Sequence, residues 1–302
     1  MICRPSITRV LACAIVALSC ARFAAADEPT TKPAEAAGAA APAGKLKVGV
    51  LISQFTATGP TKASKPYGYD HARIADELKH ASIELIPVIE PESKDDADQA
   101  NILKEKFPDF QGTPITGDDV EALKSLSVLV LARVPNLKDE VLDAISKAAD
   151  DGGVGLLVIG RCGNLTPGYK SQAVRDLVGL SAAQFAWGTG SPAPAEIVAA
   201  DDPLLAPLKD RGEWKVMATG AIGTPKEGVK PLVKLQSLDS LKFPGDSKRI
   251  DTNDYLLVYQ ATLGKGPIIV CNWTELPDVL KDLGEESFYV RCVRRLAELK
   301  KG

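Results

Sequence analysis

Histidine is nearly absent from this chain, which has only His71 and His80 among its 302 residues. Two histidines nine positions apart lack the i, i+4 spacing of a helical zinc pair, and the six cysteines form no C-x-x-C. Acidic pairs such as Asp150-Asp151 lack the alternating spacing of a calcium loop. Glycine pairs such as Gly264-Lys-Gly266 match neither the dinucleotide nor the P-loop pattern. The sequence therefore predicts no metal site and no cofactor.

An excess of basic charge is also missing. The chain contains 36 Lys and Arg against 39 Asp and Glu. Arg4, Arg9 and Arg22 are the only charged residues among the first 26, so the remainder has 33 basic and 39 acidic residues and a net charge of −6. Nucleic acids and anionic membrane surfaces attract the opposite sign. We therefore expect no nucleic-acid partner, and the sequence leaves the oligomeric state open.

The chain has no apolar run of transmembrane length. Val10–Ser19 is too short for a stable span. Because Arg4 and Arg9 precede it and Ala24-Ala25-Ala26 offers small residues for cleavage, this segment is typical of a signal peptide. The sequence thus predicts a signal over residues 1–26, no transmembrane helix, and export to the periplasm or the extracellular space.

Few cysteines lie beyond that predicted signal. They are Cys162, Cys271 and Cys292, too few for a disulfide scaffold, and their odd number leaves at least one thiol without an intramolecular partner. Cys271 ends an apolar run and Cys292 lies in a helical one, where each is expected to act as a small buried hydrophobe. The sequence does not decide whether these two pair. An alternative reading of the signal makes Cys20 a lipid attachment site of the bacterial lipoprotein kind.

Large apolar side chains are absent from residues 27–45, which are rich in Ala and Pro. Such a segment cannot bury enough surface to offset the entropy of ordering, so it is predicted to be a flexible linker. The predicted globular domain covers residues 46–302, a length that suits one α/β domain.

Short aliphatic runs bounded by breakers predict the strands of that domain. Several of these runs are apolar on both faces, which is typical of a parallel sheet covered on both sides. The last two, joined by Leu263-Gly264-Lys265-Gly266, predict an antiparallel hairpin. We expect a mostly parallel, flavodoxin-like or amidotransferase-like three-layer α/β sandwich with an antiparallel edge hairpin. The predicted strands are 47–53, 83–89, 126–132, 154–159, 196–199, 214–218, 231–235, 255–261 and 267–272.

Helical periodicity fills several of the gaps between these strands. In residues 70–80, for example, His71, Ile74 and Leu78 share one face. The polar stretch 240–254, broken by Pro244-Gly245, predicts a surface loop. The predicted helices are 70–80, 137–149, 171–180 and 285–300.

The order of four motifs resembles the ThuA-like (trehalose-utilisation-like) branch of the class I glutamine amidotransferase-like superfamily. They are Tyr69-Asp70-His71 at the start of the first helix, Asp151-Gly152-Gly153 before the strand that ends in Gly160, the segment Asp202-Pro203-Leu204, and Leu263-Gly264-Lys265-Gly266 before the last strand. The resemblance spans most of residues 46–299. It implies the amidotransferase-like fold and, through the trehalose association, a carbohydrate ligand.

The chain departs from the family pattern at three points. Cys162 stands where the family usually has histidine, Asp202 replaces the histidine before Pro203, and Asn272-Trp273 replaces a Gly-His pair. The resemblance therefore does not carry an activity over to this chain.

Cys162 is nevertheless the first candidate for catalysis, because it follows the predicted strand 154–159 at its carboxyl end. In an amidotransferase the nucleophile's helix begins at once and lowers the thiol pKa. Here Pro167-Gly168 delays the helix, and no histidine or complete triad follows. A packed or loop thiol is the alternative.

His71 is the second candidate. If Asp70 caps the first helix, His71 lies in its first turn at the carboxyl edge of the sheet, where neutral imidazole is favoured. Since parallel strands place their carboxyl ends at one edge, a Cys162–His71 pair is a hypothesis that would make the protein a cysteine hydrolase. The alternative is a half-buried packing residue on the face shared with Ile74.

A third set of residues predicts a ligand site rather than a catalytic one. Arg161, Asn164 and Trp273 also fall at predicted strand ends, and an exposed tryptophan ring there would stack on a sugar. The alternative is an aromatic anchor packed on the domain. We expect an exported, non-catalytic or degenerate domain that binds a small polar molecule, with carbohydrate as a candidate ligand. The hydrolase and a structural or protein-interaction module are the rival readings.

Overall fold

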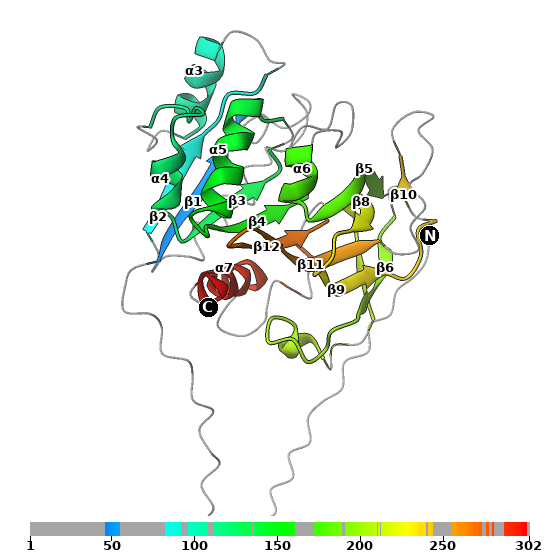
Figure 1. Ribbon diagram of the computed structural model, residues 1–302. Coiled ribbons are helices and arrows are strands. Elements are labelled where there is room, and N and C mark those ends of the chain that lie inside the picture. Colours follow the sequence, from blue (N-terminus) through cyan, green and yellow to red (C-terminus); the bar gives the residue numbers. More distant parts are fainter. Residues whose placement is uncertain are drawn as a thin grey trace, which may run out of the picture. The chain divides into compact units, whose positions relative to one another are not determined.

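The structure is a computed structural model, shown in Figure 1. It describes residues 46–54, 82–91, 96–107, 112–134, 136–160, 172–188, 191–209, 211, 213–239, 241–243, 255–273, 276–277, 280 and 287–300. All of these belong to one unit, Ala43–Gly302. The predicted signal, the linker and the predicted helix 70–80 lie outside the described residues.

Five parallel strands form one half of a nine-stranded sheet. Their order is β2-β1-β3-β4-β12, and each neighbouring pair runs parallel. Every residue of β3, β4 and β12 is buried, because both faces of the sheet are covered. The predicted flavodoxin-like class is confirmed by this order. The strands are β1 (Lys47–Ile52), β2 (Ser82–Pro87), β3 (Val128–Ala132), β4 (Gly155–Ile159) and β12 (Gly266–Cys271).

Alternate residues of these strands enter two different hydrophobic clusters, which gives the three predicted layers. Val130 and Leu157 face the cluster that contains helix α7 (Phe288–Leu299). Leu129 and Leu156 face the cluster that contains α5 (Asp139–Asp150). In Figure 1 the two helices lie on opposite faces of the sheet.

Four antiparallel strands complete the sheet on the far side of β12. They are β11 (Leu256–Leu263), β9 (Lys230–Leu235), β6 (Ala193–Ile197) and β7 (Trp214–Val216). The predicted hairpin is confirmed: β11 and β12 pair up to Leu263 and Gly266, so only Gly264 and Lys265 form the turn. Gly264 has a φ of +55°, a left-handed conformation that glycine adopts without strain.

A second, three-stranded sheet was not predicted. Its order is β10-β5-β8, formed by β10 (Leu241–Lys242), β5 (Leu180–Gly188) and β8 (Thr219–Pro225). The predicted helix 171–180 is too long, because α6 (Gln172–Leu177) ends before Gly179, where φ is +63° and the chain turns into β5. The predicted loop 240–254 is wrong at its start, where buried Leu241 pairs with Gly188.

Three short helical elements were also missed. They are α3 (Asp96–Lys106), α4 (Val120–Lys124) and the 3-10 helix η1 (Ala206–Leu208). In α3 only Gln99 and Leu103 are buried, so the helix has almost no apolar periodicity to detect. Within the described residues, no helix combines the length and the apolar composition needed to cross a membrane.

Candidate functional site

The strand order places a topological switch point between β1 and β3. From β1 the chain moves to β2 on one side and then returns to β3 on the other. In open α/β sheets, ligands bind at the carboxyl ends of the two strands that flank such a switch point. Ser53 follows β1 at this edge and is buried, and Arg133 follows β3.

Arg133 is the most unusual residue at this edge. It is only 5% exposed, although a guanidinium is seldom buried. Its φ of +52° makes it the one non-glycine residue in the left-handed region among those described. Its N–H donates to the Ile159 carbonyl at 3.1 Å, and this bond holds the bend. A strained conformation of this kind persists where the surrounding structure enforces it, most often at functional sites.

A buried polar pair fixes the chain where it leaves β2. Gln99 of α3 accepts a hydrogen bond from the Glu90 N–H at 2.9 Å and donates one from Nε2 to the Glu90 carbonyl at 3.1 Å. Both residues are buried. The two bonds use the backbone of Glu90, so its carboxylate is held at the carboxyl edge by a rigid main chain.

Asn136 adds a carboxamide to the connection that follows β3. Its Oδ1 is buried and has no hydrogen-bond partner among the described residues. A buried acceptor without a partner costs free energy of about 1–3 kcal/mol. A polar ligand that donates a hydrogen bond would remove this cost.

Gly160 directly follows β4 and has a left-handed backbone. Its φ is +63°, and its N–H donates to the Cys271 carbonyl at 2.7 Å. A Cβ at this position would lie 2.9 Å from the Trp273 carbonyl oxygen and 3.6 Å from Cγ of Arg133. Position 160 therefore has no room for a side chain. The aliphatic part of the Arg133 side chain packs next to it.

Four of the five predicted site residues follow Gly160 or belong to the first predicted helix. Arg161, Cys162 and Asn164, together with His71, lie outside the described residues. The Cys162–His71 pair and the ligand-binding roles of Arg161 and Asn164 stay predictions.

Trp273, the fifth predicted site residue, is described, and the expectation of an exposed ring is wrong. Its side chain is fully buried. The indole N–H donates to the Tyr289 hydroxyl at 3.0 Å, and the ring contacts Phe288 edge to face with centroids 5.6 Å apart. Helix α7 packs over the end of β12 and covers the ring, as the alternative of a packed anchor describes.

The preceding residue, Asn272, is also occupied by the fold. Its Nδ2 donates to the carbonyls of Ala221 and Leu256, both at 2.9 Å, and its Oδ1 accepts from the Ala221 N–H at 3.3 Å. A Cβ on Gly220 would come within 2.1 Å of this Oδ1. The side chain thus joins β8 of the small sheet to β11 of the large one.

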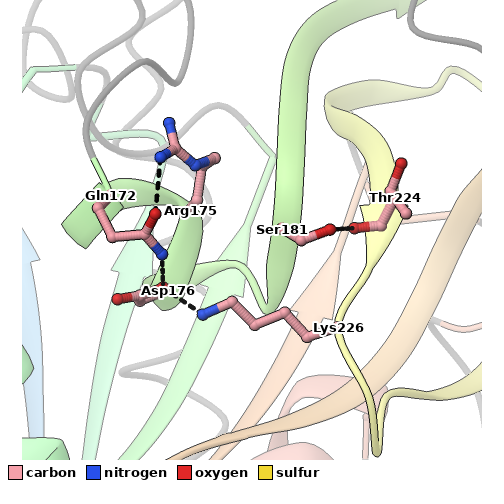
Figure 2. A network of polar contacts seen from close by, with 6 residues as sticks. All are labelled: Gln172, Arg175, Asp176, Ser181, Thr224 and Lys226. Atoms are coloured by element: carbon pink, nitrogen blue, oxygen red, sulfur yellow. Dashed lines mark hydrogen bonds and ion pairs between the residues drawn. The ribbon is translucent and has the colours of Figure 1, made fainter.

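Helix α6 comes after the segment that carries Cys162. It is held in place by a residue from a distant part of the sequence. Asp176 of α6 forms an ion pair with Lys226 just after β8, and it accepts a hydrogen bond from Gln172 at 2.5 Å, as Figure 2 shows. The Ser181 hydroxyl donates to the Thr224 carbonyl at 3.1 Å and ties β5 to β8. These contacts hold α6 against the strands of the small sheet.

Four polar residues of this edge were not predicted from the sequence: Ser53, Glu90, Arg133 and Asn136. A simple signal marks Glu90 and Arg133, since each is the polar residue that directly follows a predicted strand, 83–89 or 126–132. Within the described ranges, no three His, Cys, Asp or Glu side chains are grouped so that they could hold a metal ion.

No family model matches the chain, and no curated protein matches it. Similar solved structures include a cytoplasmic protein of Salmonella typhimurium, with 15% identity and a TM-score of 0.46 over 84% of this chain and 99% of that one. A ThuA-like protein of Bacteroides uniformis has 13% identity and a TM-score of 0.46 over 85% of this chain and 91% of that one.

A β-galactosidase of Bacillus circulans sp. alkalophilus is similar as well, with 12% identity and a TM-score of 0.47. The match covers 82% of this chain and only 30% of that enzyme. At these identities a likeness concerns the fold and not the chemistry. The fold class of this chain rests on its strand order and register.

Proposed function

We propose that this protein is an exported binding module that holds a small polar ligand at the carboxyl ends of β1, β3 and β4. The observation that carries the proposal is Arg133, which is buried, left-handed in φ and located at the switch point of the sheet. The fold keeps a charged side chain in a strained backbone at the edge where ligands of open α/β sheets bind.

The chemistry of this edge favours a ligand rich in hydroxyl groups. Ser53, Glu90, Arg133 and Asn136 supply a hydroxyl, a carboxylate, a guanidinium and a carboxamide. A carboxylate accepts hydrogen bonds, a guanidinium only donates them, and the other two groups can do both. Sugar hydroxyls also donate and accept, so a mono- or disaccharide matches the hydrogen-bonding chemistry of all four groups. This makes carbohydrate the ligand class that we propose.

A thermal-shift titration of the full chain with trehalose, galactose and mannose tests the proposal. A ligand that binds only the folded state raises its stability by about 2.7 kcal/mol at a hundred times Kd, which corresponds to a rise in Tm of roughly 5–10 °C. Arg133→Met keeps the packed stem and removes the donors, so it should abolish the shift. Arg295→Met, which alters a partly exposed pair with Glu298 on α7, should retain it.

Two outcomes would contradict the proposal. One is that none of the three sugars raises Tm. The other is that a sugar raises Tm equally in the wild type and in Arg133→Met, which would place the binding elsewhere. A Cys162-dependent release of product from an ester or amide substrate, lost in Cys162→Ser, would favour the hydrolase instead.

Export is the part of the proposal that rests on the first 26 residues alone. Expression of the full chain in a bacterial host, followed by mass measurement of the purified protein, should give a product that starts at Asp27. A lipid-linked Cys20 at the N-terminus would establish the lipoprotein alternative, and an intact Met1 in the cytoplasm would contradict export.

A further inference from the structure

Helix α7 has a fixed register on the sheet, set at both of its ends. Near its start, the Tyr289 hydroxyl accepts the indole N–H of Trp273, just beyond β12. Near its end, Leu296 lies over the first residue of β4, where a Cβ on Gly155 would come within 2.9 Å of the Leu296 Cβ. The helix therefore runs antiparallel to β4 and β12 at close range.

Cys292 falls between these two fixed points. It is one turn after Phe288 and one turn before Leu296, so all three lie on the face of α7 that covers the sheet. Cys271 ends β12 and pairs in register with Ile159, close to the Trp273 end of the helix. Both cysteines are fully buried in the same cluster, and the neighbouring Cys271 contributes to raising the pKa of the Cys292 thiol.

We propose that Cys271 and Cys292 are a disulfide site, closed when the protein folds in the presence of a thiol–disulfide oxidant. Both cysteines are free thiols in the structure. They come from two separate elements that are packed in fixed register and that contribute to the same buried cluster. The bond would anchor α7 to β12 through the core.

The oxidation proceeds by two exchanges. The thiolate of one cysteine attacks a disulfide of the oxidant, which is a glutathione-like or protein disulfide, and expels one thiol. The second cysteine then attacks the mixed disulfide and releases the other thiol. Two protons and two electrons leave the cysteine pair, and the oxidant's disulfide is reduced to two thiols. Because both sulfurs are buried in the folded chain, the exchange takes place before the core closes.

Refolding of the full chain in a mixture of reduced and oxidised glutathione tests this site. The chain is unfolded with reductant, diluted into the redox buffer, quenched with acid, and alkylated under denaturing conditions before peptide mapping. We expect a linked Cys271–Cys292 peptide and an alkylated Cys162. Cys162→Ser should leave that linkage unchanged, and Cys271→Ser should abolish it.

The same preparation provides a second, variant-free measurement. Wild type refolded with glutathione should melt on the order of 5–10 °C above the same protein kept in reductant, because the crosslink restricts the unfolded chain. Alkyl label on both cysteines would contradict the proposal, as would a linkage of either one to Cys162 or to glutathione alone. An equal or lower Tm for the linked form would also overturn it. None of these outcomes depends on the ligand site.

Discussion

At the scale of single residues, the carboxyl edge combines burial with backbone strain in Arg133. A left-handed φ costs an L-residue about 1–2 kcal/mol, because Cβ approaches the following carbonyl oxygen. Glycine does not have this cost. Position 133 therefore carries a conformational cost that a glycine would not have. The structure nevertheless has an arginine side chain there.

The strain at Arg133 can be measured by comparing two truncations. Arg133→Ala and Arg133→Gly both remove the guanidinium and its stem, and they differ only in the cost of the left-handed φ. We expect the free energy of unfolding of Arg133→Gly to exceed that of Arg133→Ala by about 1 kcal/mol. Urea denaturation of both variants checks this. Equal stabilities would mean that residue 133 leaves the left-handed region once the side chain is removed.

The buried thiol of Cys292 predicts a loss of stability in alkali for the reduced protein. Burial is the main cause that raises the pKa of this thiol, and the contact with Cys271 raises it further. The unfolded chain releases the proton near pH 8.5, whereas the folded chain retains it. The folded state then binds more protons, so its stability is fully present below pH 8.5 and falls as the pH rises above it, by up to about 1.4 kcal/mol per pH unit.

Urea denaturation at pH 8 and pH 10 in reductant tests this linkage. Cys292→Ala should be less stable than the wild type at pH 8, because of the cavity, but it should lose about 1–2 kcal/mol less on going to pH 10. Val293→Ala, a neighbouring buried truncation without a titratable group, should lose as much as the wild type. An identical loss in Cys292→Ala would show that the thiol does not contribute.

At the scale of elements, the turn between β11 and β12 determines how the centre of the sheet meets helix α5. Gly264 lies against the end of α5, where a Cβ would come within 1.6 Å of Oδ1 of Asp150. The Lys265 N–H donates to the Asp150 carbonyl at 3.1 Å. The hairpin thus contacts the helix through a residue without a side chain. This close contact sets the distance between the end of α5 and the turn.

Gly264→Ala should therefore destabilise the protein more than an alanine at a glycine in open space. Gly228 is the matched control, because its φ is +82° and a Cβ added there would have no atom within 4 Å. Both substitutions add the cost of a positive φ, but only Gly264→Ala adds a steric conflict. We expect its loss in the free energy of unfolding to be larger by about 1–3 kcal/mol.

A double variant separates the two contributions at Gly264. Asp150→Ala removes the carboxylate that the new Cβ would meet, so it should recover part of the loss in Gly264→Ala. Chemical denaturation of the four proteins completes the cycle. Additive effects of the two substitutions would show that the turn moves away from α5 and that the contact does not set its position.

At the scale of the whole molecule, hydrophobic pattern predicts the large sheet and fails for the small one. The buried apolar runs within β1, β3 and β4 are recognisable because both faces of the sheet are covered there. In contrast, β5 is built from residues such as Ser181, Ala182 and Ala183, which are small and partly exposed. It pairs with β8, which is distant in the sequence, and β8 is in turn held to β11 by the hydrogen bonds of Asn272. A local sequence pattern does not contain such long-range contacts.

The same limit applies to the candidate site. The rule that ligands bind at the carboxyl edge points to the same candidate region in the sequence and in the structure. The candidate residues within that region were chosen mainly for reactive or stacking side chains, such as those of Cys162, His71 and Trp273. Arg133 was therefore not predicted. Trp273 was misjudged because its burial depends on α7, which is formed by residues that follow it at some distance. Strain at Arg133 has no signature in sequence, since it results from how β3 and β4 end together.

The position of β12 has a consequence for how this domain is made. The strand occupies the middle of the nine-stranded order, between β4 and β11, yet it comes after every other strand in the sequence. While a ribosome is still synthesising the chain, the parallel and antiparallel halves have no shared strand to join them. The sheet becomes continuous only after residue 271 has emerged, so the nascent domain stays open until late in its synthesis.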